Sequence, residues 1–442
     1  MILQRHLPIL LLAAAAAGAC APPSGPTAPT PRGVRGLPAA PTLVRARPGV
    51  VGMDRSLPAT LDSIVRAGIA AGAAPGAELV VGRWGRIVLE RGYGHTDTAV
   101  ASPVPDDSTL WDMASLTKVI ATTTSAMILQ EAGRLDIDTP VVSYLPEFNA
   151  PEKAGITVRM LLEHRGGLEA GANLAREYRG RAAYLRQINA RPLKYAPGDS
   201  TIYSDWDFVL MGLIVEGISG EPLDRFARER IFQPLGMRDT DFQPLAPGTP
   251  PLPPDTNCTA LVGHATPRRL ARIAPTEWDR ESRPGHLWGI VHDNNACAMG
   301  GVSGHAGLFS SGRDLAIFAQ MLLNEGEYDG VRVLRPGTVA SWTARRRPAS
   351  SRALGWDTPA DNSSAGRYFG PRAFGHTGYT GGSIWIDPER GLFVILLTNR
   401  VNPTSRNTRH EPLRRAVADA VQEAILDAPL VDWEARRERK QP

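Results

Sequence analysis

Two runs of β-forming residues near the start of the chain are separated by a short turn. The first is Ala-Glu-Leu-Val-Val-Gly over 77–82, and the second is Arg-Ile-Val-Leu-Glu over 86–90. The segment between them contains Trp84-Gly85. Short apolar runs that flank a glycine-containing turn are typical of a β-hairpin. We therefore predict a hairpin near the N-terminus.

A second pair of such runs lies near the other end of the chain. Ser-Ile-Trp-Ile-Asp over 383–387 and Leu-Phe-Val-Ile-Leu-Leu-Thr over 392–398 flank the turn Pro-Glu-Arg-Gly. After this second predicted hairpin, apolar residues recur at every fourth position, which predicts one face of an amphipathic helix. These apolar residues are Leu413, Val417, Val421 and Ile425.

The middle of the chain is predicted to be helical. Apolar positions with helical spacing, broken by glycine and proline, indicate helices over 116–132, 158–164, 206–218 and 223–231, and one that begins near 313. The simplest architecture is an α/β (α+β) fold, with an antiparallel sheet built from both chain ends, flanking helices and an inserted helical region. We expect a functional site where the two parts meet.

The first residues resemble an export signal. Arg5 precedes an apolar run over 7–19 that is too short to cross a bilayer of about 30 Å as a helix. This predicts a secretory signal over 1–19. Ala17-Gly18-Ala19-Cys20 resembles a bacterial lipobox, in which the cysteine becomes the lipid-modified first residue, although Leu is usual in place of Ala17. An ordinary signal peptide is the alternative.

The rest of the chain divides into a Pro/Ala-rich linker over 20–50, one domain over 51–428 and a basic tail over 429–442. We expect an exported protein of the periplasm or cell envelope that is anchored to a membrane through Cys20. In such a compartment Cys258 and Cys297 can form a disulfide, and two unrelated buried thiols are the alternative.

Composition narrows the functional classes. Of the 442 residues, 43% are hydrophobic, which is ordinary for a globular protein and excludes wholesale disorder. The net charge of +4 is small, and no dense basic face precedes the tail. We therefore predict no nucleic-acid partner.

The candidate nucleophile is a serine that lies one helical turn before a lysine. Ser115 lies where a loop enters a predicted helix, and Lys118 follows on the same face. A serine hydroxyl becomes nucleophilic when a nearby base accepts its proton, and amides at a helix N-terminus can stabilise an oxyanion. A serine cap beside a surface lysine is the structural alternative. No Walker A, GxGxxG, CxxC, HExxH or GxSxG motif competes with this pair.

Two later segments strengthen this interpretation. Tyr203-Ser204-Asp205 supplies a phenol that can move protons, and His376-Thr377-Gly378-Tyr379 opens a glycine-rich segment before the second hairpin. Taken separately, a packing tyrosine and a simple turn would explain them.

The three segments in this order resemble the S-x-x-K, Y-x-N/D and H/K-T-G motifs of the β-lactamase and penicillin-binding-protein superfamily. The similarity covers roughly 55–425 and favours the class C-type branch, which includes β-lactamases, DD-peptidases and esterases. It implies the following roles: Ser115 as acylated nucleophile, Lys118 as proton acceptor, Tyr203 as proton donor or acceptor, the amides of Ser115 and Tyr379 as oxyanion hole, and His376, Thr377 and Gly378 as the substrate edge.

Two residues depart from the class C pattern. Asp205 replaces Asn and would place a carboxylate near Lys118, which would keep the lysine protonated and shift the proton transfer to Tyr203. His376 replaces Lys and removes a permanent positive charge that would hold the carboxylate of a β-lactam. We therefore do not expect strong β-lactamase activity. With an ordinary pKa near 6.5, His376 would become charged between pH 7.5 and pH 5.5 and could then attract a substrate carboxylate.

A group of polar residues could offer metal ligands, but their spacing does not require a metal. We expect them to brace loops through hydrogen bonds, and we predict neither metal nor cofactor. These residues are His292, Asp293, Asn294, Asn295 and His305.

We therefore predict a serine hydrolase that forms an acyl-enzyme on Ser115. The predicted substrates are peptidoglycan-derived D-amino-acid peptides or small esters, with β-lactams as slow substrates or inhibitors. A catalytically silent penicillin-binding or sensor module of the same fold is the alternative.

Overall fold

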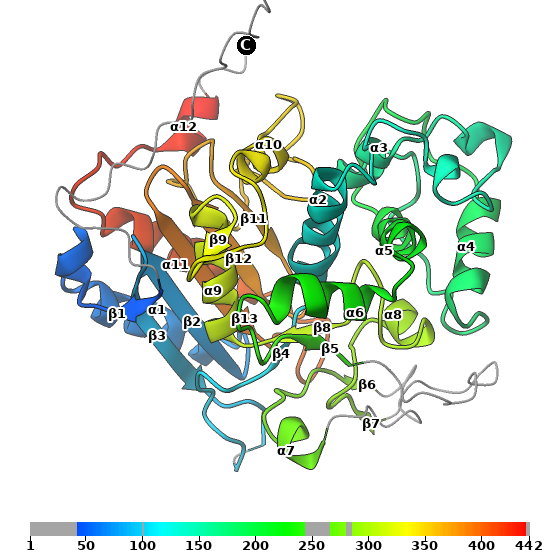
Figure 1. The fold of residues 1–442 in the computed structure, drawn as a ribbon. Coiled ribbons are helices and arrows are strands. Elements are labelled where there is room, and N and C mark those ends of the chain that lie inside the picture. The colour runs from blue at the N-terminus through cyan, green and yellow to red at the C-terminus, as the bar shows by residue number, and fades with distance from the viewer. Residues whose placement is uncertain (1–41, 100, 244–265, 280–284, 439–442) are drawn as a thin grey trace, which may run out of the picture.

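The computed structural model describes residues 42–99, 101–243, 266–279 and 285–438. Its centre is a six-stranded sheet that joins the two ends of the chain (Figure 1). In spatial order its strands are β1 (Val44–Arg45), β3 (Arg86–Gly94), β2 (Gly76–Arg83), β13 (Leu392–Thr398), β12 (Ser383–Asp387) and β11 (Phe374–Thr377).

Both predicted hairpins are present, as β2–β3 and β12–β13. Trp84 and Gly85 form the first turn with φ of 51° and 75°, the left-handed conformation that matches the twist of the strands. β13 pairs antiparallel with β2, so the chain ends form one sheet as predicted. The sheet is antiparallel as predicted except at one edge, where the two-residue strand β1 pairs parallel with β3. This strand also lies before the predicted domain boundary at residue 51.

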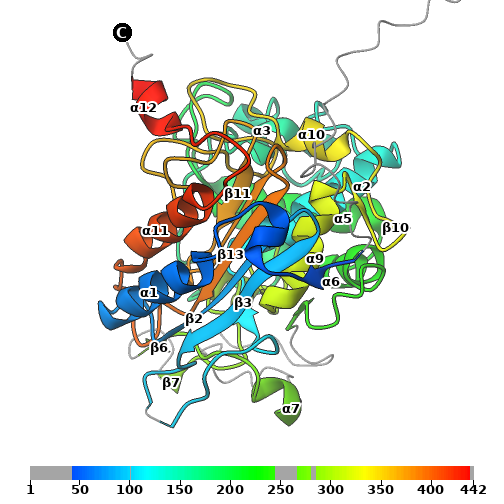
Figure 2. The same cartoon turned by 90° about the vertical axis from the view of Figure 1, so that its left-hand side faces the viewer.

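Helices cover both faces of the sheet. α1 (Leu57–Ala70) and α11 (His410–Glu423) lie side by side on one face (Figure 2). α11 is the predicted amphipathic helix; it buries Leu413, Val417 and Val421 and ends before Ile425. α9 (Gly312–Leu323), which begins within one residue of its predicted start, packs against β2 and β13.

The inserted helical region follows β3 and includes the other four predicted helices. They are η2 (Lys118–Thr123) continued by α2 (Thr124–Glu131), α3 (Val158–Leu162), α5 (Asp205–Ser219), and α6 (Leu223–Ala227) continued by η5 (Arg228–Phe232). η2 and η5 are π-helical. Sequence periodicity alone gives no sign of these wider turns.

Smaller elements complete the described chain. The helices are η1 (Pro48–Val51), η3 (Val141–Ser143), η4 (Pro151–Lys153), α4 (Arg181–Ala190), α7 (Pro267–Leu270), α8 (Asn294–Ala298), α10 (Thr338–Thr343) and α12 (Trp433–Glu438). The strands are β4 (Trp111–Asp112), β5 (Asp241–Phe242), β6 (Trp278–Asp279), β7 (Gly285–His286), β8 (Leu308–Ser310), β9 (Glu327–Tyr328) and β10 (Val331–Arg332).

The C-terminal segment departs from the predicted basic tail. Glu434, in α12, forms an ion pair of 2.9 Å with Arg415 and accepts a hydrogen bond of 2.7 Å from the amide of Asn362. These contacts attach α12 to the domain. Across the part of the chain that the structure describes, no helix is both long enough and apolar enough to cross a lipid bilayer.

The predictions for the signal, for Cys20 and for Cys258 concern residues outside the described ranges, and they stay predictions. Cys297 is buried in α8 and is disulfide-bonded. Because Cys258 is outside the described residues, its pairing with Cys297 is untested.

Candidate active site

Ser115 lies in a tight loop between β4 and η2. The preceding residue, Ala114, has φ of 44°, a left-handed conformation that costs free energy in a residue with a Cβ atom. The Asp112 carboxylate stabilises this loop, because it accepts hydrogen bonds from the amides of Ala114 at 2.8 Å and His292 at 2.7 Å. Ser115 is thus held at the entrance of a long helical segment, as predicted.

Lys118 is buried one turn after Ser115 and has three hydrogen-bond acceptors. Its ammonium donates to Ser115 Oγ at 3.0 Å, to Asp205 Oδ1 at 2.8 Å and to the backbone oxygen of His305 at 3.2 Å. Burial alone would lower the pKa of Lys118, but Asp205 and Tyr203 outweigh burial and raise this pKa above its usual value. The predicted contact between Lys118 and Asp205 is present, at 2.8 Å, and it favours the charged form of Lys118.

Tyr203 completes the group. It lies just before α5, whose first residue is Asp205, and its ring centroid is 4.9 Å from Lys118 Nζ. The Tyr203 hydroxyl is buried and makes no hydrogen bond within the described residues. The structure therefore brings together Ser115, Lys118 and Tyr203, which lie far apart in the sequence, and leaves the phenolic oxygen without a protein partner.

The predicted substrate edge lies against the nucleophile loop. His376 and Thr377 end β11, and Gly378 begins a turn that closes with a 2.7 Å hydrogen bond from its amide to the Gly382 oxygen. A Cβ atom on Gly378 would lie 2.7 Å from the Met113 oxygen, so this close approach requires glycine. Within the described residues, the amides of Ser115 and Tyr379 have no acceptor. They remain candidates for the predicted oxyanion hole.

Two further contacts fix the turn over 378–382. Thr380 Oγ1 donates a 2.7 Å hydrogen bond to the Asp112 oxygen. Arg414, buried on α11, donates to the oxygens of Gly381 at 3.1 Å, Gly378 at 2.8 Å and Gly382 at 2.7 Å. Sequence analysis missed Arg414. The sequence did contain a signal for this residue, because Arg414 lies next to the apolar positions of the predicted C-terminal helix.

His376 corrects an expectation from the sequence. Its Nδ1 lies 2.8 Å from the Thr377 oxygen, and because a carbonyl only accepts, this nitrogen carries the proton. Burial first, and then Arg352 and Lys118, lower the pKa of His376 well below its usual value. The expectation that His376 becomes charged between pH 7.5 and pH 5.5 is wrong, since it treated the ring as solvated.

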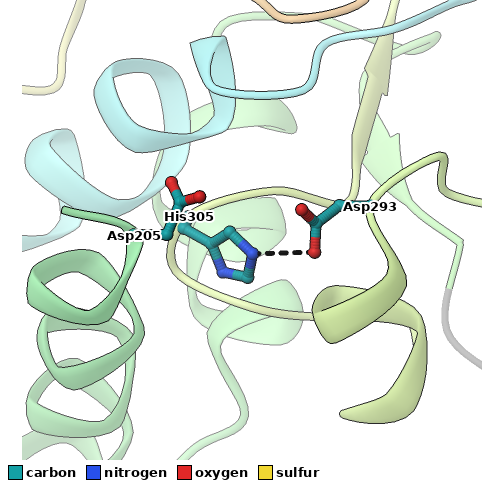
Figure 3. A group of neighbouring side chains, drawn as sticks. All are labelled: Asp205, Asp293 and His305. Carbon is teal, nitrogen blue, oxygen red and sulfur yellow. Dashed lines mark hydrogen bonds and ion pairs between the residues drawn. The ribbon is translucent and has the colours of Figure 1, made fainter. Parts of the chain in front are cut away.

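Asp205, Asp293 and His305 lie together (Figure 3). Lys118 donates hydrogen bonds to the Asp205 carboxylate and to the backbone oxygen of His305. Their ligand atoms lie within 4.8 Å of one another, close enough to hold a metal ion. His305 Nε2, however, is 2.9 Å from Asp293 Oδ1, and its Nδ1 is 2.8 Å from Ser303 Oγ. These contacts are the loop-bracing hydrogen bonds expected from the sequence, and they use both ring nitrogens.

These residues face a cleft of about 1270 Å³ that Ser115, Tyr203 and Tyr379 also line. Four carboxylates line it: Asp97, Asp205, Glu277 and Asp293. Burial alone would raise the pKa of Glu277, but hydrogen bonds from His292 and Ser405 lower it to about 2. Three of these carboxylates have a nitrogen partner: Asp205 lies 2.8 Å from Lys118, Glu277 2.9 Å from His292 and Asp293 2.9 Å from His305.

Comparison with known proteins agrees with this geometry. Residues 61–419 match the sequence model of the family described as Beta-lactamase. A protein of Salmonella agona (strain SL483) named "Putative D-alanyl-D-alanine carboxypeptidase" is 34% identical over 396 residues, which cover 84% of this chain and 89% of that protein. The chain therefore belongs to the Beta-lactamase family, whose members are hydrolases similar to β-lactamases and penicillin-binding proteins.

Solved structures show the same fold. A penicillin-binding protein homologue from Caulobacter crescentus has a TM-score of 0.64 and 21% identity, and the match covers 84% of this chain and 99% of that one. EstCE1, described as a hydrolase with promiscuous acyltransferase activity, has a TM-score of 0.61 and 21% identity, with the same coverage.

Asp205→Asn tests the protonation state of Lys118. Without the carboxylate, burial dominates and the pKa of Lys118 falls. We expect the alkaline limb of the pH profile of kcat/KM to move down by roughly one to three pH units. The assay is ester hydrolysis over pH 6–10, with Asp199→Asn, an exposed acid on the same segment, as control. An unchanged limb would show that the ion pair does not set the charge of Lys118.

His376→Asn tests whether His376 is neutral. Because its pKa lies well below the usual value, protonation of His376 should not contribute to substrate binding at pH 5.5. We expect the ratio of KM at pH 5.5 to KM at pH 7.5, for a substrate with a carboxylate, to be the same in wild type and variant. A tightening at low pH that is present in wild type and lost in the variant would contradict this.

Proposed function

We propose that this protein is a serine hydrolase that forms an acyl-enzyme on Ser115 and acts on D-amino-acid peptides or small esters. The observation that carries the proposal is the 3.0 Å hydrogen bond from the buried Lys118 ammonium to Ser115 Oγ, beside the unpaired hydroxyl of Tyr203. A serine cap with a surface lysine would not bury the ammonium.

The ion pair between Lys118 and Asp205 favours Tyr203 as the group that transfers the proton. A protonated Lys118 cannot accept the serine proton, but it stabilises negative charge on Ser115 Oγ as the oxygen attacks. The phenol acts as a relay: its oxygen accepts the proton of Ser115 as its own O–H proton passes to the leaving group and the scissile bond breaks, so that Tyr203 again carries one proton. Water attacks the resulting ester, the acid product departs, and Ser115 regains its proton.

The oxyanion is stabilised by the amides of Ser115 and Tyr379. The turn over 378–382 presents the Tyr379 amide, and its contacts with Asp112 and Arg414 prevent it from moving. Donors that are fixed before the reaction need no reorganisation as charge develops on the carbonyl oxygen.

Several features favour peptides and esters over β-lactams. The relative from Salmonella agona is named for D-alanyl-D-alanine, which points to a peptide with a C-terminal D-residue. In this chain the position of the motif lysine is taken by His376, whose pKa lies well below its usual value. The missing positive charge weakens the hold on a β-lactam carboxylate, so β-lactams would react slowly or act as inhibitors.

A silent binding module of the same fold is the second candidate. A solved structure with the same fold is named a penicillin-binding protein homologue, and the cleft could hold a ligand without turnover. The retention of Ser115, Lys118 and Tyr203 in contact geometry favours turnover.

Single substitutions separate the two candidates. We expect Ser115→Ala to abolish hydrolysis of a p-nitrophenyl ester and of a peptide ending in D-alanyl-D-alanine, because it removes only the attacking oxygen. Tyr203→Phe should lower kcat/KM by about 10²- to 10⁴-fold, the usual contribution of a group that moves protons. Lys118→Ala should lower it by about 10²- to 10³-fold, the usual cost of losing a donor that stabilises developing negative charge. Ser303→Ala is the control at a serine outside the proposed chemistry. Full activity in Ser115→Ala would contradict the proposal, and no turnover in wild type would favour the silent module.

We also propose that the protein is exported and lipid-anchored through Cys20. The support is the apolar run over 7–19 and the Pro-rich linker that follows. In a Gram-negative host, wild type should partition into detergent with the membrane fraction and Cys20→Ser should not, because several acyl chains anchor stably where none does. Wild type recovered free in the periplasm would show an ordinary signal peptide.

A further inference from the structure

His164 holds the segment that carries Tyr203 at two points. Its backbone oxygen accepts a hydrogen bond of 3.1 Å from the amide of Ile202, and its ring nitrogen Nδ1 accepts one of 3.1 Å from the amide of Ser204. These two amides flank Tyr203 in the chain. Residues 201–204 belong to no helix or strand, so no regular backbone pairing fixes them. The path of the backbone through Tyr203 therefore depends on His164.

The His164 ring also lies against the phenol. The centroids of the His164 and Tyr203 rings are 4.5 Å apart, and the ring planes are tilted by 44°. Phe208, on α5, lies 5.3 Å from the same histidine ring, which is buried. Because side chains in such close packing have little room to turn, these contacts limit the orientations of the phenol.

His164 adopts a backbone conformation that a histidine rarely takes. It lies just after α3 with φ of 55°, in the left-handed region. Such a conformation costs free energy in a residue with a Cβ atom, and it persists where the surrounding contacts favour it. Here it lets the backbone oxygen and the ring of one residue both reach the segment over 202–204.

The hydrogen bonds also determine which nitrogen of His164 carries the proton. A backbone amide can only donate, so Nδ1 is an acceptor and Nε2 carries the proton. Burial first, and then Arg352 and Lys118, lower the pKa of His164 well below its usual value. Asp207 Oδ2 is also 3.1 Å from Nδ1, and burial raises the pKa of Asp207 well above its usual value, so this acid can donate to Nδ1 as well. His164 is thus a neutral acceptor that anchors the Ser204 amide.

We infer that His164 is a positioning residue, which holds the Tyr203 hydroxyl where it can relay the proton from Ser115 to the leaving group. In the proposed function, on which this inference rests, the phenolic oxygen must reach both of these partners at once. A small displacement of such a group costs a large part of the rate. His164 is not among the described residues that line the cleft, so it acts through Tyr203.

The test compares two esters whose leaving groups differ in basicity, phenyl acetate and p-nitrophenyl acetate. Phenolate is the more basic leaving group and needs the proton from Tyr203 more than p-nitrophenolate does. The readout is the ratio of kcat/KM for the phenyl ester to kcat/KM for the p-nitrophenyl ester. We expect His164→Phe, which keeps an aromatic ring and removes Nδ1, to lower this ratio by about ten- to a hundredfold.

A conservative variant identifies the contact that matters. His164→Asn has a side-chain oxygen on the γ carbon, as histidine has Nδ1, and asparagine tolerates the left-handed conformation. We expect it to restore most of the ratio. His164→Gln, whose polar atoms lie one bond further out, replaces the phenylalanine variant if that variant does not fold by circular dichroism. His410→Phe, at another buried histidine, is the control and should keep the wild-type ratio.

The Tyr203→Phe background separates positioning from a general structural role. Once the hydroxyl is absent, His164→Phe should cause no further loss of kcat/KM, because the two residues act as a unit. A merely structural role would cause the same loss in both backgrounds. That result, an unchanged ratio in His164→Phe, or an equal loss for both esters would overturn the inference.

The same variants separate this inference from the proposed function. If Tyr203→Phe is as active as wild type, the proposed relay fails and the role of His164 fails with it. If Tyr203→Phe loses activity and His164→Phe does not lower the ratio, the inference alone fails and the proposed function stands.

Discussion

The buried ammonium of Lys118 is the interaction on which the rest of the site depends. A charge removed from water is tolerated when acceptors surround it, and here they come from three separate segments. Ser115 precedes η2, Asp205 begins α5, and the His305 oxygen belongs to the loop before β8. The contact that orients the nucleophile therefore also holds together the parts of the fold that form the cleft.

The sheet contributes to the site through a second set of contacts. They are made by the turn that follows its edge strand, β11. The turn after β11 is fixed to the nucleophile loop by Thr380 and to α11 by Arg414. Because α11 packs on α1, the position of the Tyr379 amide depends on helices from both ends of the chain. This explains why the site around the proposed nucleophile, near residue 115, depends on contacts made by residues in the last third of the sequence.

Much of the fold follows from local pattern. The hairpins and the helices over the middle of the chain could be predicted, because apolar runs that flank a turn and apolar positions with helical spacing both mark buried segments. α1 also carried such a pattern, with Leu57, Leu61 and Val65 buried at intervals of four, and it was overlooked. β1 could not be predicted, since two exposed residues contain no pattern and their pairing depends on the neighbouring strand.

The candidate site, too, could be predicted from the sequence only in part. Motif spacing identified Ser115, Lys118, Tyr203 and the segment from His376 to Tyr379. The sequence could not show how deeply His376 is buried, and so its charge was misjudged. Arg414 was missed because its role comes from what it contacts across the fold.

The central claim is that Ser115 is an activated nucleophile that becomes acylated. The most direct measurement is mass spectrometric mapping of the folded protein after brief exposure to a fluorophosphonate, with and without prior saturation by an ester substrate. The account predicts one adduct, on the peptide that contains Ser115, whose formation the ester slows. An adduct on another residue, or none on correctly folded protein, would contradict it.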